Sequence, residues 1–207
     1  MKSLIGQKLS MGQEFDKEGN VLPFTAVEIK PAVILQIKTK ETDGYEAVKL
    51  AYGQGKGKYN KKPTLGEMKK ASLKNAPQKI LEVAGDSGGK KIGDKIKVEE
   101  FFTAGEIVSA TGWTKGRGFA GVIKRWGFHG GPQTHGQSDR LRAPGSIGQG
   151  TDPGRVHRGK KMPGRYGGDR KTIKGLKILK VDEKNNQLLI SGAIPGARCG
   201  YVIISKK

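Results

Sequence analysis

The stretch TKGRGFAGVIKRW, residues 114–126, marks the point where this chain changes character. Gly alternates with Lys and Arg in its first half, a pattern typical of neither an amphipathic helix nor a half-buried strand. Around it, residues 111–171 hold 13 Lys+Arg, three Asp, 16 of the 33 Gly, both Trp and all three His. Residues 113–171 are therefore predicted to form a long, irregular, basic extension. Residues 1–112 and 172–207 are predicted to form the folded domain.

The flanking residues carry short apolar or β-branched runs bounded by Gly, Asn or Asp, which predict antiparallel strands. Short strands at this spacing favour a mainly β fold, either a barrel or a sandwich. A less regular insertion is expected near residues 56–85, with one or two short helices; Thr64 and Glu67 fit a capping box ahead of Met68. The expected strands are 27–29, 33–37, 45–52, 92–102, 106–113, 172–181, 187–190 and 201–204, with residues 182–186 as a hairpin turn.

The net charge points to a polyanionic partner. The chain has 39 Lys+Arg and 19 Asp+Glu, a formal charge of +20. Such a surplus repels itself in a compact monomer, whereas phosphates neutralise it and release counterions. A membrane surface would call for an amphipathic cationic helix, and the sequence contains none. One cysteine, Cys199, and the lack of an apolar segment after Met1 predict a reducing, cytosolic location.

The extension has the chemistry of an RNA-binding segment. Gly lets a backbone lie close to a phosphodiester chain, and Lys115, Arg117, Lys124 and Arg125 can neutralise phosphates. Trp126 and Phe128 offer flat faces to bases or riboses. Packing of Trp126 and Phe119 at the base of the extension is an alternative, as is a disordered linker, although two Trp argue against disorder. A second basic cluster comprises Arg155, His157, Arg158, Lys160, Lys161 and Arg165.

Competing motifs fit poorly. Gly116-x-Gly118-x-x-Gly121 matches a dinucleotide fingerprint, but Gly and Pro follow too soon for the helix that the fingerprint needs. The segment 85–90 misses the spacing of a phosphate loop. The three His lack Cys and acidic neighbours for zinc, and Ser138-Asp139 beside His135 is a weak triad candidate. We therefore expect no cofactor, no metal and no enzymatic activity.

Several motifs together resemble the bacterial type of the ribosomal protein L three family. They are residues 115–126, Thr134-His135-Gly136, residues 144–149, residues 153–156 and residues 159–164; Gly6 to Met11 is similar to the family's opening strand and residues 193–197 to its closing turn. The resemblance implies a translation-factor-type barrel on the large ribosomal subunit that binds 23S rRNA early in assembly, near proteins L fourteen and L nineteen. It further implies that the extension approaches the peptidyl transferase centre without entering the chemistry.

The resemblance also implies roles for single residues. Gln149 occupies the position that a methyltransferase converts to N5-methylglutamine in many bacteria, while Leu141 stands where the family often has His. Trp126 and His135 are expected to pack on bases or sugars. The residues expected to contact phosphate are Lys115, Arg117, Lys124, Arg125, Arg140, Arg142, Arg155, Lys160 and Lys161.

Two rival functions remain. A free-standing RNA chaperone or RNA-binding translation factor could use a similar barrel, although a GTP-dependent factor would need the phosphate loop that is absent. An enzyme acting on nucleic acid would need a carboxylate cluster for two-metal chemistry, and the sequence offers none. Co-sedimentation with large subunits separates a ribosomal protein from a chaperone.

Overall fold

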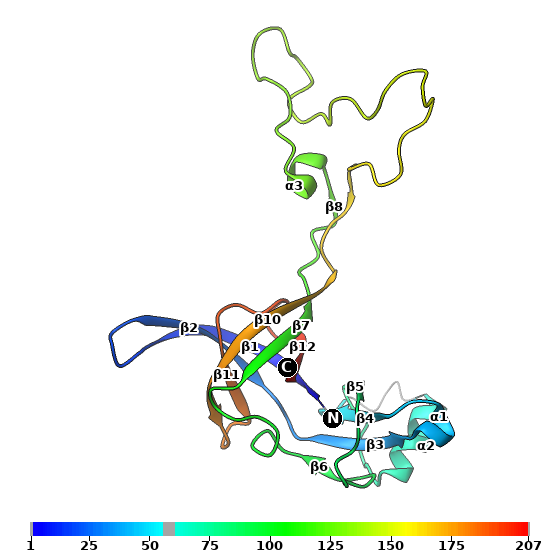
Figure 1. The fold of residues 1–207 in the computed structure, drawn as a ribbon, viewed down its shortest axis with the longest axis vertical. Helices are drawn as coiled ribbons and strands as arrows, with labels where there is room; N and C mark the ends of the chain where they lie inside the picture. The colour runs from blue at the N-terminus through cyan, green and yellow to red at the C-terminus, as the bar shows by residue number, and fades with distance from the viewer. Residues whose placement is uncertain (1, 56–60, 207) are drawn as a thin grey trace. The chain divides into compact units, whose positions relative to one another are not determined.

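The computed structural model describes residues 2–55 and 61–206, which are mainly β-structure (Figure 1). The chain forms two compact units: unit 1 is residues 1–113 and 170–207, and unit 2 is Thr114–Asp169. Unit 2 contains β8 (Phe119–Ala120), α3 (Val122–Trp126) and β9 (Gly164–Arg165). Unit 1 contains β1 (Ser3–Phe15), β2 (Val21–Glu28), β3 (Ala32–Lys38), α1 (Lys40–Asp43), β4 (Ala47–Tyr52), α2 (Lys62–Lys70), β5 (Lys79–Ala84), β6 (Lys95–Ile96), β7 (Ile107–Trp113), β10 (Arg170–Asp182), β11 (Gln187–Ser191) and β12 (Tyr201–Lys206).

Six strands of unit 1 pair antiparallel in a closed ring, in the order β1-β12-β7-β10-β11-β2, and β2 pairs back to β1. Leu4 on β1 lies opposite Ile204 on β12, which lies opposite Ala110 on β7. All three are fully buried. Because successive side chains of a strand point to opposite faces, the apolar alternation of these strands fills the core while their other residues meet solvent.

A second sheet, in the order β5-β4-β3-β6, completes unit 1. Ile34 and Leu50 of this sheet belong to the same buried cluster as Leu4 and Ile204 of the ring, so the two sheets share one core. The hydroxyl of Tyr52 on β4 donates a hydrogen bond to the carbonyl oxygen of Glu28 at the end of β2, at 3.1 Å. Burial raises the pKa of the Tyr52 phenol above its ordinary value of 10.0, so the hydroxyl stays protonated and remains a donor.

Seven of the eight predicted strands coincide with observed strands over most of their length, and the turn at 182–186 is confirmed as well. The Asp182 Oδ1 accepts hydrogen bonds from the backbone N–H groups of Lys184 and Asn185, and Asn186 takes a positive φ of 52°. Asx turns of this kind satisfy the backbone locally where two strands meet. The conformation of this hairpin turn is therefore decided by residues within the turn itself.

The strand predicted over residues 92–102 is wrong. Only Lys95–Ile96 is a strand, and the rest forms turns: the Phe101 and Phe102 N–H groups both bond to the Val98 carbonyl oxygen. Ile96, Val98 and Phe102 are nonetheless buried. The apolar residues of this segment thus supply core side chains without strand pairing, which their periodicity alone could not distinguish.

The helix near residue 64 is confirmed, but its predicted start is wrong. α2 begins at Lys62 after Lys61, which makes no side-chain cap, and Pro63 lies in its first turn. Thr64 and Glu67 therefore lie inside the helix, and Glu67 accepts hydrogen bonds from the Lys49 ammonium at 2.7 and 2.8 Å instead of capping. Proline is favoured at the start of a helix because the N–H it lacks has no partner there. The described residues contain three helices, whereas the sequence predicted one or two. None of the three is long and apolar enough to cross a membrane.

Candidate nucleic-acid interface

Unit 2 begins and ends in a paired segment, here called the neck: residues 114–120 and 164–169. β8 and β9 pair antiparallel at its far end. Before them the Arg117 N–H bonds to the Tyr166 carbonyl oxygen at 2.8 Å, and the Tyr166 N–H bonds to the Gly118 carbonyl oxygen at 2.9 Å. Gly167 has a φ of 74°, and a Cβ there would overlap the Lys115 carbonyl oxygen. The neck therefore requires glycine at this position both for its dihedral angle and for its close backbone approach.

The helix α3 follows the neck directly. Gly121 precedes it in an extended conformation, and Gly127 ends it with a φ of 75°, the left-handed conformation that commonly stops a helix. Val122 is buried, as is Ala120 just before the helix. α3 is thus a short helix that begins at a buried apolar residue, with Lys124 and Arg125 in its last turn.

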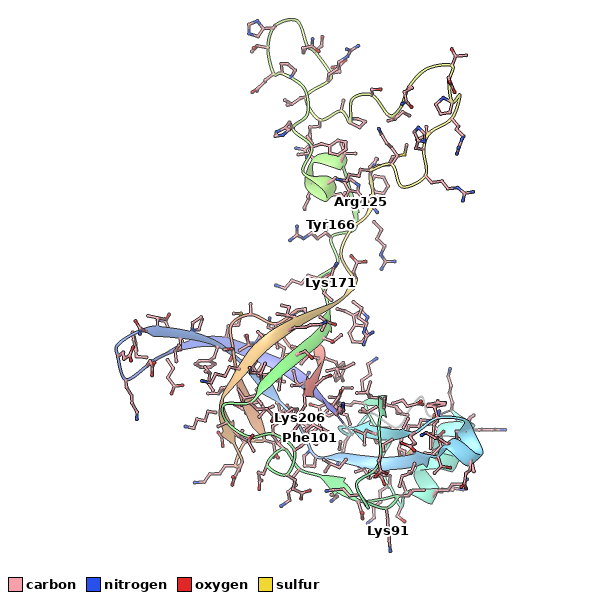
Figure 2. The ribbon with its side chains drawn as sticks, in the orientation of Figure 1. Lys91, Phe101, Arg125, Tyr166, Lys171 and Lys206 are labelled. Atoms are coloured by element: carbon pink, nitrogen blue, oxygen red, sulfur yellow. The ribbon has the colours of Figure 1, made fainter. Side chains whose placement is uncertain are left out.

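Arg125 and Trp126 join α3 to the returning chain. The Arg125 Nη1 and the Trp126 Nε1 donate to the same acceptor, the Met162 carbonyl oxygen, at 2.7 and 2.8 Å. The Arg125 guanidinium lies 4.9 Å from the Trp126 ring centroid, and the Lys161 ammonium lies 5.8 Å from it. We call Arg125, Trp126, Lys161 and Met162 the clip. Figure 2 labels Arg125 and Tyr166 on the two segments of unit 2 that converge at the neck.

Between α3 and β9, residues 127–163 form two loops with few hydrogen bonds of their own (Figure 1), and Lys161 and Met162 at the end of the second loop belong to the clip. The first is closed by the Gly131 N–H, which bonds to the Leu141 carbonyl oxygen at 3.2 Å. It borders a hollow of about 410 Å³ lined by residues that include Phe128, His129 and Arg140. In the second loop, His157 Nε2 lies 3.1 Å from Gln149 Oε1.

The charge of unit 2 is almost unneutralised. It holds eleven Lys+Arg against three Asp, a net charge of +8. The six ion pairs found among the described residues all lie in unit 1, and none involves a cation of unit 2. Cations that lack carboxylate partners repel one another, so the segment is stabilised when an external polyanion surrounds it.

Flat side chains accompany these cations. The Phe119 side chain is 79 % exposed and that of Trp126 is 42 % exposed. The Arg117 guanidinium lies 5.1 Å from the centre of the Tyr166 ring. Exposed rings next to arginines suit base stacking combined with phosphate contact, the combination that single-stranded and looped RNA offers.

A sequence profile described as Ribosomal protein L3 matches residues 30–194, about four-fifths of the chain. The chain belongs to the ribosomal protein L3 family. It is similar to the large ribosomal subunit protein uL3 of Herpetosiphon aurantiacus, at 43 % identity over 100 % of this chain and 96 % of that protein. The proteins of the same name from Dehalococcoides mccartyi (44 %, over 100 % and 98 %) and Pseudomonas putida (45 %, over 97 % and 94 %) are similar along their whole lengths as well.

The residues predicted to bind rRNA are distributed over all parts of unit 2. Lys115 and Arg117 lie in the neck, and Lys124, Arg125 and Trp126 lie in α3. The structure brings Arg125, Trp126 and Lys161 together in the clip and leaves the others apart. His135, Arg140 and Arg142 lie in the first loop, and Gln149, Arg155, Lys160 and Lys161 in the second; all are exposed, whereas Arg125 is half-buried.

The sequence did not reveal two members of this site. Tyr166 carries a ring against Arg117, and an aromatic residue two positions after Gly164 in a basic segment was a usable signal. The Met162 carbonyl oxygen accepts hydrogen bonds from both clip donors. No sequence signal could have indicated it, because every residue presents the same backbone acceptor.

Proposed function

We propose that this chain is a non-enzymatic structural constituent of the large ribosomal subunit, located on cytoplasmic ribosomes, and that it binds 23S rRNA mainly through unit 2. The observation that carries the proposal is the net charge of +8 in unit 2, with no carboxylate partner for any of its cations among the described residues. Membership of the ribosomal protein L3 family supports the choice of ribosomal RNA as the polyanion.

Within this proposal the six-stranded ring is a translation-factor-type barrel, and residues 1–112 and 172–207 are the folded base. Residues 113–171 are the arm that enters the rRNA and extends toward the peptidyl transferase centre. The neck and clip fix the start of the arm, while residues 127–160, between the two sides of the clip, take their final conformation from rRNA. The scarcity of hydrogen bonds within these loops supports this division, because such segments gain order from a partner.

The charged residues neutralise phosphates, and the flat ones pack on bases or riboses. Arg presents a planar fork that can contact phosphate bidentately, whereas Lys acts as a point charge. Trp126 and His135 are the proposed base or sugar contacts. The proposed phosphate contacts are Lys115, Arg117, Lys124, Arg125, Arg140, Arg142, Arg155, Lys160 and Lys161.

Gln149 is the proposed site of N5-methylation by a glutamine methyltransferase. Its side chain is exposed, and its oxygen rather than its amide nitrogen faces His157. A Cβ at either neighbour, Gly148 or Gly150, would meet nothing within 4 Å, so both flanks leave room for an enzyme. We propose ribosomal proteins L fourteen and L nineteen as neighbours in the subunit.

The salt dependence of binding tests the electrostatic part of the proposal. Binding to a 23S rRNA fragment should weaken with salt by a log–log slope of about 0.7–0.9 for each phosphate neutralised. Replacing two cations of the second loop, Lys160→Gln with Lys161→Gln, should reduce that slope by roughly 1.4–1.8 if each contacts one phosphate. The matched control is Lys17→Gln with Lys184→Gln, two exposed turn positions of unit 1, which should leave the slope unchanged. A slope near zero for the unsubstituted protein would contradict the proposal.

A further inference from the structure

The strands β1 and β2 continue beyond the ring as a two-stranded hairpin. β1 pairs with β12 only over residues 3–7, and β2 pairs with β11 only over residues 24–28. Between these ranges the two strands pair mainly with each other and project from the ring (Figure 1). We call residues 10–24 the hairpin tip. The structure describes every residue of this segment, and none of them is buried.

The two faces of the hairpin tip differ. On one face the Phe24 ring covers Gly12, so that a Cβ on Gly12 would lie 2.8 Å from the ring. The other face presents Phe15 opposite Val21, with Met11 further along the same face. These three side chains are 66 %, 52 % and 52 % exposed. Side chains of paired residues point the same way, so the three form one uncovered apolar face.

The charge of the hairpin tip is opposite to that of the rest of the chain. It holds Glu14, Asp16 and Glu18 against the single Lys17, a net charge of −2 in a chain of +20. All four are exposed. Carboxylates here repel phosphate, and exposed acids next to an apolar face complement a surface that carries cations around an apolar patch. A nucleic acid fits this tip poorly, whereas a basic protein fits it well.

We propose that the apolar face of the hairpin tip docks a basic protein within the assembled large subunit. Phe15, Val21 and Met11 form its centre, and Asp16 and Glu18 of the turn form its rim, whereas Glu14 lies on the opposite face with Gly12. The inference rests on the proposed function for its location in the subunit, but it assigns the hairpin tip to a protein partner while unit 2 takes the rRNA.

Photo-crosslinking in purified large subunits tests this assignment. Gln13 lies between Met11 and Phe15 on the same face, so Gln13→benzoylphenylalanine places the probe there and keeps the apolar residues intact. Ultraviolet irradiation should link this chain to a polypeptide with a positive net charge, identified by mass spectrometry. Phe15→Ser should lower the yield by about tenfold or more, as truncation of a central interface side chain does. The matched control is Ile107→Ser, a comparably exposed apolar position on β7 at 53 %, which should leave the yield unchanged.

Neutralising the carboxylates of the rim tests the contribution of charge to docking separately from that of the apolar contact. Asp16→Asn and Glu18→Gln together should lower the yield and weaken its dependence on salt. The amide introduced by Asp16→Asn keeps a side-chain oxygen that can accept the Lys17 N–H, so the turn retains its hydrogen bond. A crosslink to rRNA, to an acidic protein, or to nothing would overturn the docking proposal while co-sedimentation with the subunit leaves the proposed function standing. Failure of the unsubstituted chain to co-sediment would overturn both.

Discussion

The clip predicts that Trp126 stabilises the neck of unit 2 independently of unit 1. Trp126→Ala removes the indole N–H that donates to the Met162 carbonyl oxygen at 2.8 Å, and also the ring that faces Arg125 and Lys161. One hydrogen bond contributes about 1 kcal/mol. Two exposed cation–π contacts contribute about 0.5 kcal/mol each. The substitution should therefore lower the free energy of local opening by about 2 kcal/mol, or roughly 30-fold.

Trp126→Phe gives the matched comparison. It keeps a ring for the two cations and loses only the N–H donor, while Arg125 still donates to the Met162 carbonyl oxygen at 2.7 Å. Because that acceptor keeps one partner, we expect a cost of about 1 kcal/mol, or roughly fivefold.

Native-state hydrogen exchange measures both effects, because each amide reports the opening of its own region. The Tyr166 amide, bonded to the Gly118 carbonyl oxygen at 2.9 Å, should exchange faster by these factors, while the amides of β12 should not change. Equal exchange at Tyr166 in the unsubstituted protein and in Trp126→Ala would refute the clip as a stabilising element. Equal acceleration in β12 would refute the independence of the two units.

Three further outcomes follow from other contacts. Gly167→Ala should open the neck, because a φ of 74° costs alanine about 1–2 kcal/mol and the added Cβ would overlap the Lys115 carbonyl oxygen. Faster hydrogen exchange of the Arg117 amide measures this opening. The control is Gly116→Ala, whose added Cβ would meet nothing within 4 Å and should have little effect. Tyr52→Phe should lower the free energy of unfolding of unit 1 by about 0.5–1.5 kcal/mol in a urea titration, because the partly buried hydrogen bond to the Glu28 carbonyl oxygen is lost. No change would show that the hydroxyl contributes nothing to stability. Hydrogen bonds from Lys38 and Tyr45 hold the pKa of the Glu82 carboxyl below its ordinary value of 4.5. The stability that these bonds confer is therefore complete above pH 4.5 and is lost as the pH falls through the lower pKa of the folded state. Glu82→Gln should flatten the acid side of a plot of the free energy of unfolding against pH, and an unchanged plot would contradict this.

Local sequence was sufficient wherever neighbouring residues decide the conformation. The strands at 106–113, 172–181 and 187–190 follow from apolar alternation. The turn at 182–186 follows from Asp and Asn chemistry within five residues. The concentration of cations in one glycine-rich segment likewise follows from the sequence, because net charge depends on composition alone.

Pairing between distant segments was beyond such reasoning. No local pattern indicates that β1 pairs with β12, some 200 residues away, or that β3 leaves the ring for a second sheet. The apolar run at 92–102 illustrates the limit: Ile96, Val98 and Phe102 are buried, but mostly in turns, because the core needs their side chains and not their backbone hydrogen bonds. Periodicity records which side chains are apolar, whereas the partner of each backbone group is chosen by the whole fold.

By itself, therefore, the sequence determined the mainly β class, the position of the cationic extension and the residue types that can contact phosphate. Tertiary structure alone decided the closure of the ring, the division of unit 1 into two sheets, and the meeting of Arg125, Trp126 and Lys161 beside one carbonyl oxygen. The physical reason is that charge and hydrophobicity belong to single side chains. Strand pairing and a shared acceptor exist only when segments far apart in the chain are brought within hydrogen-bonding distance.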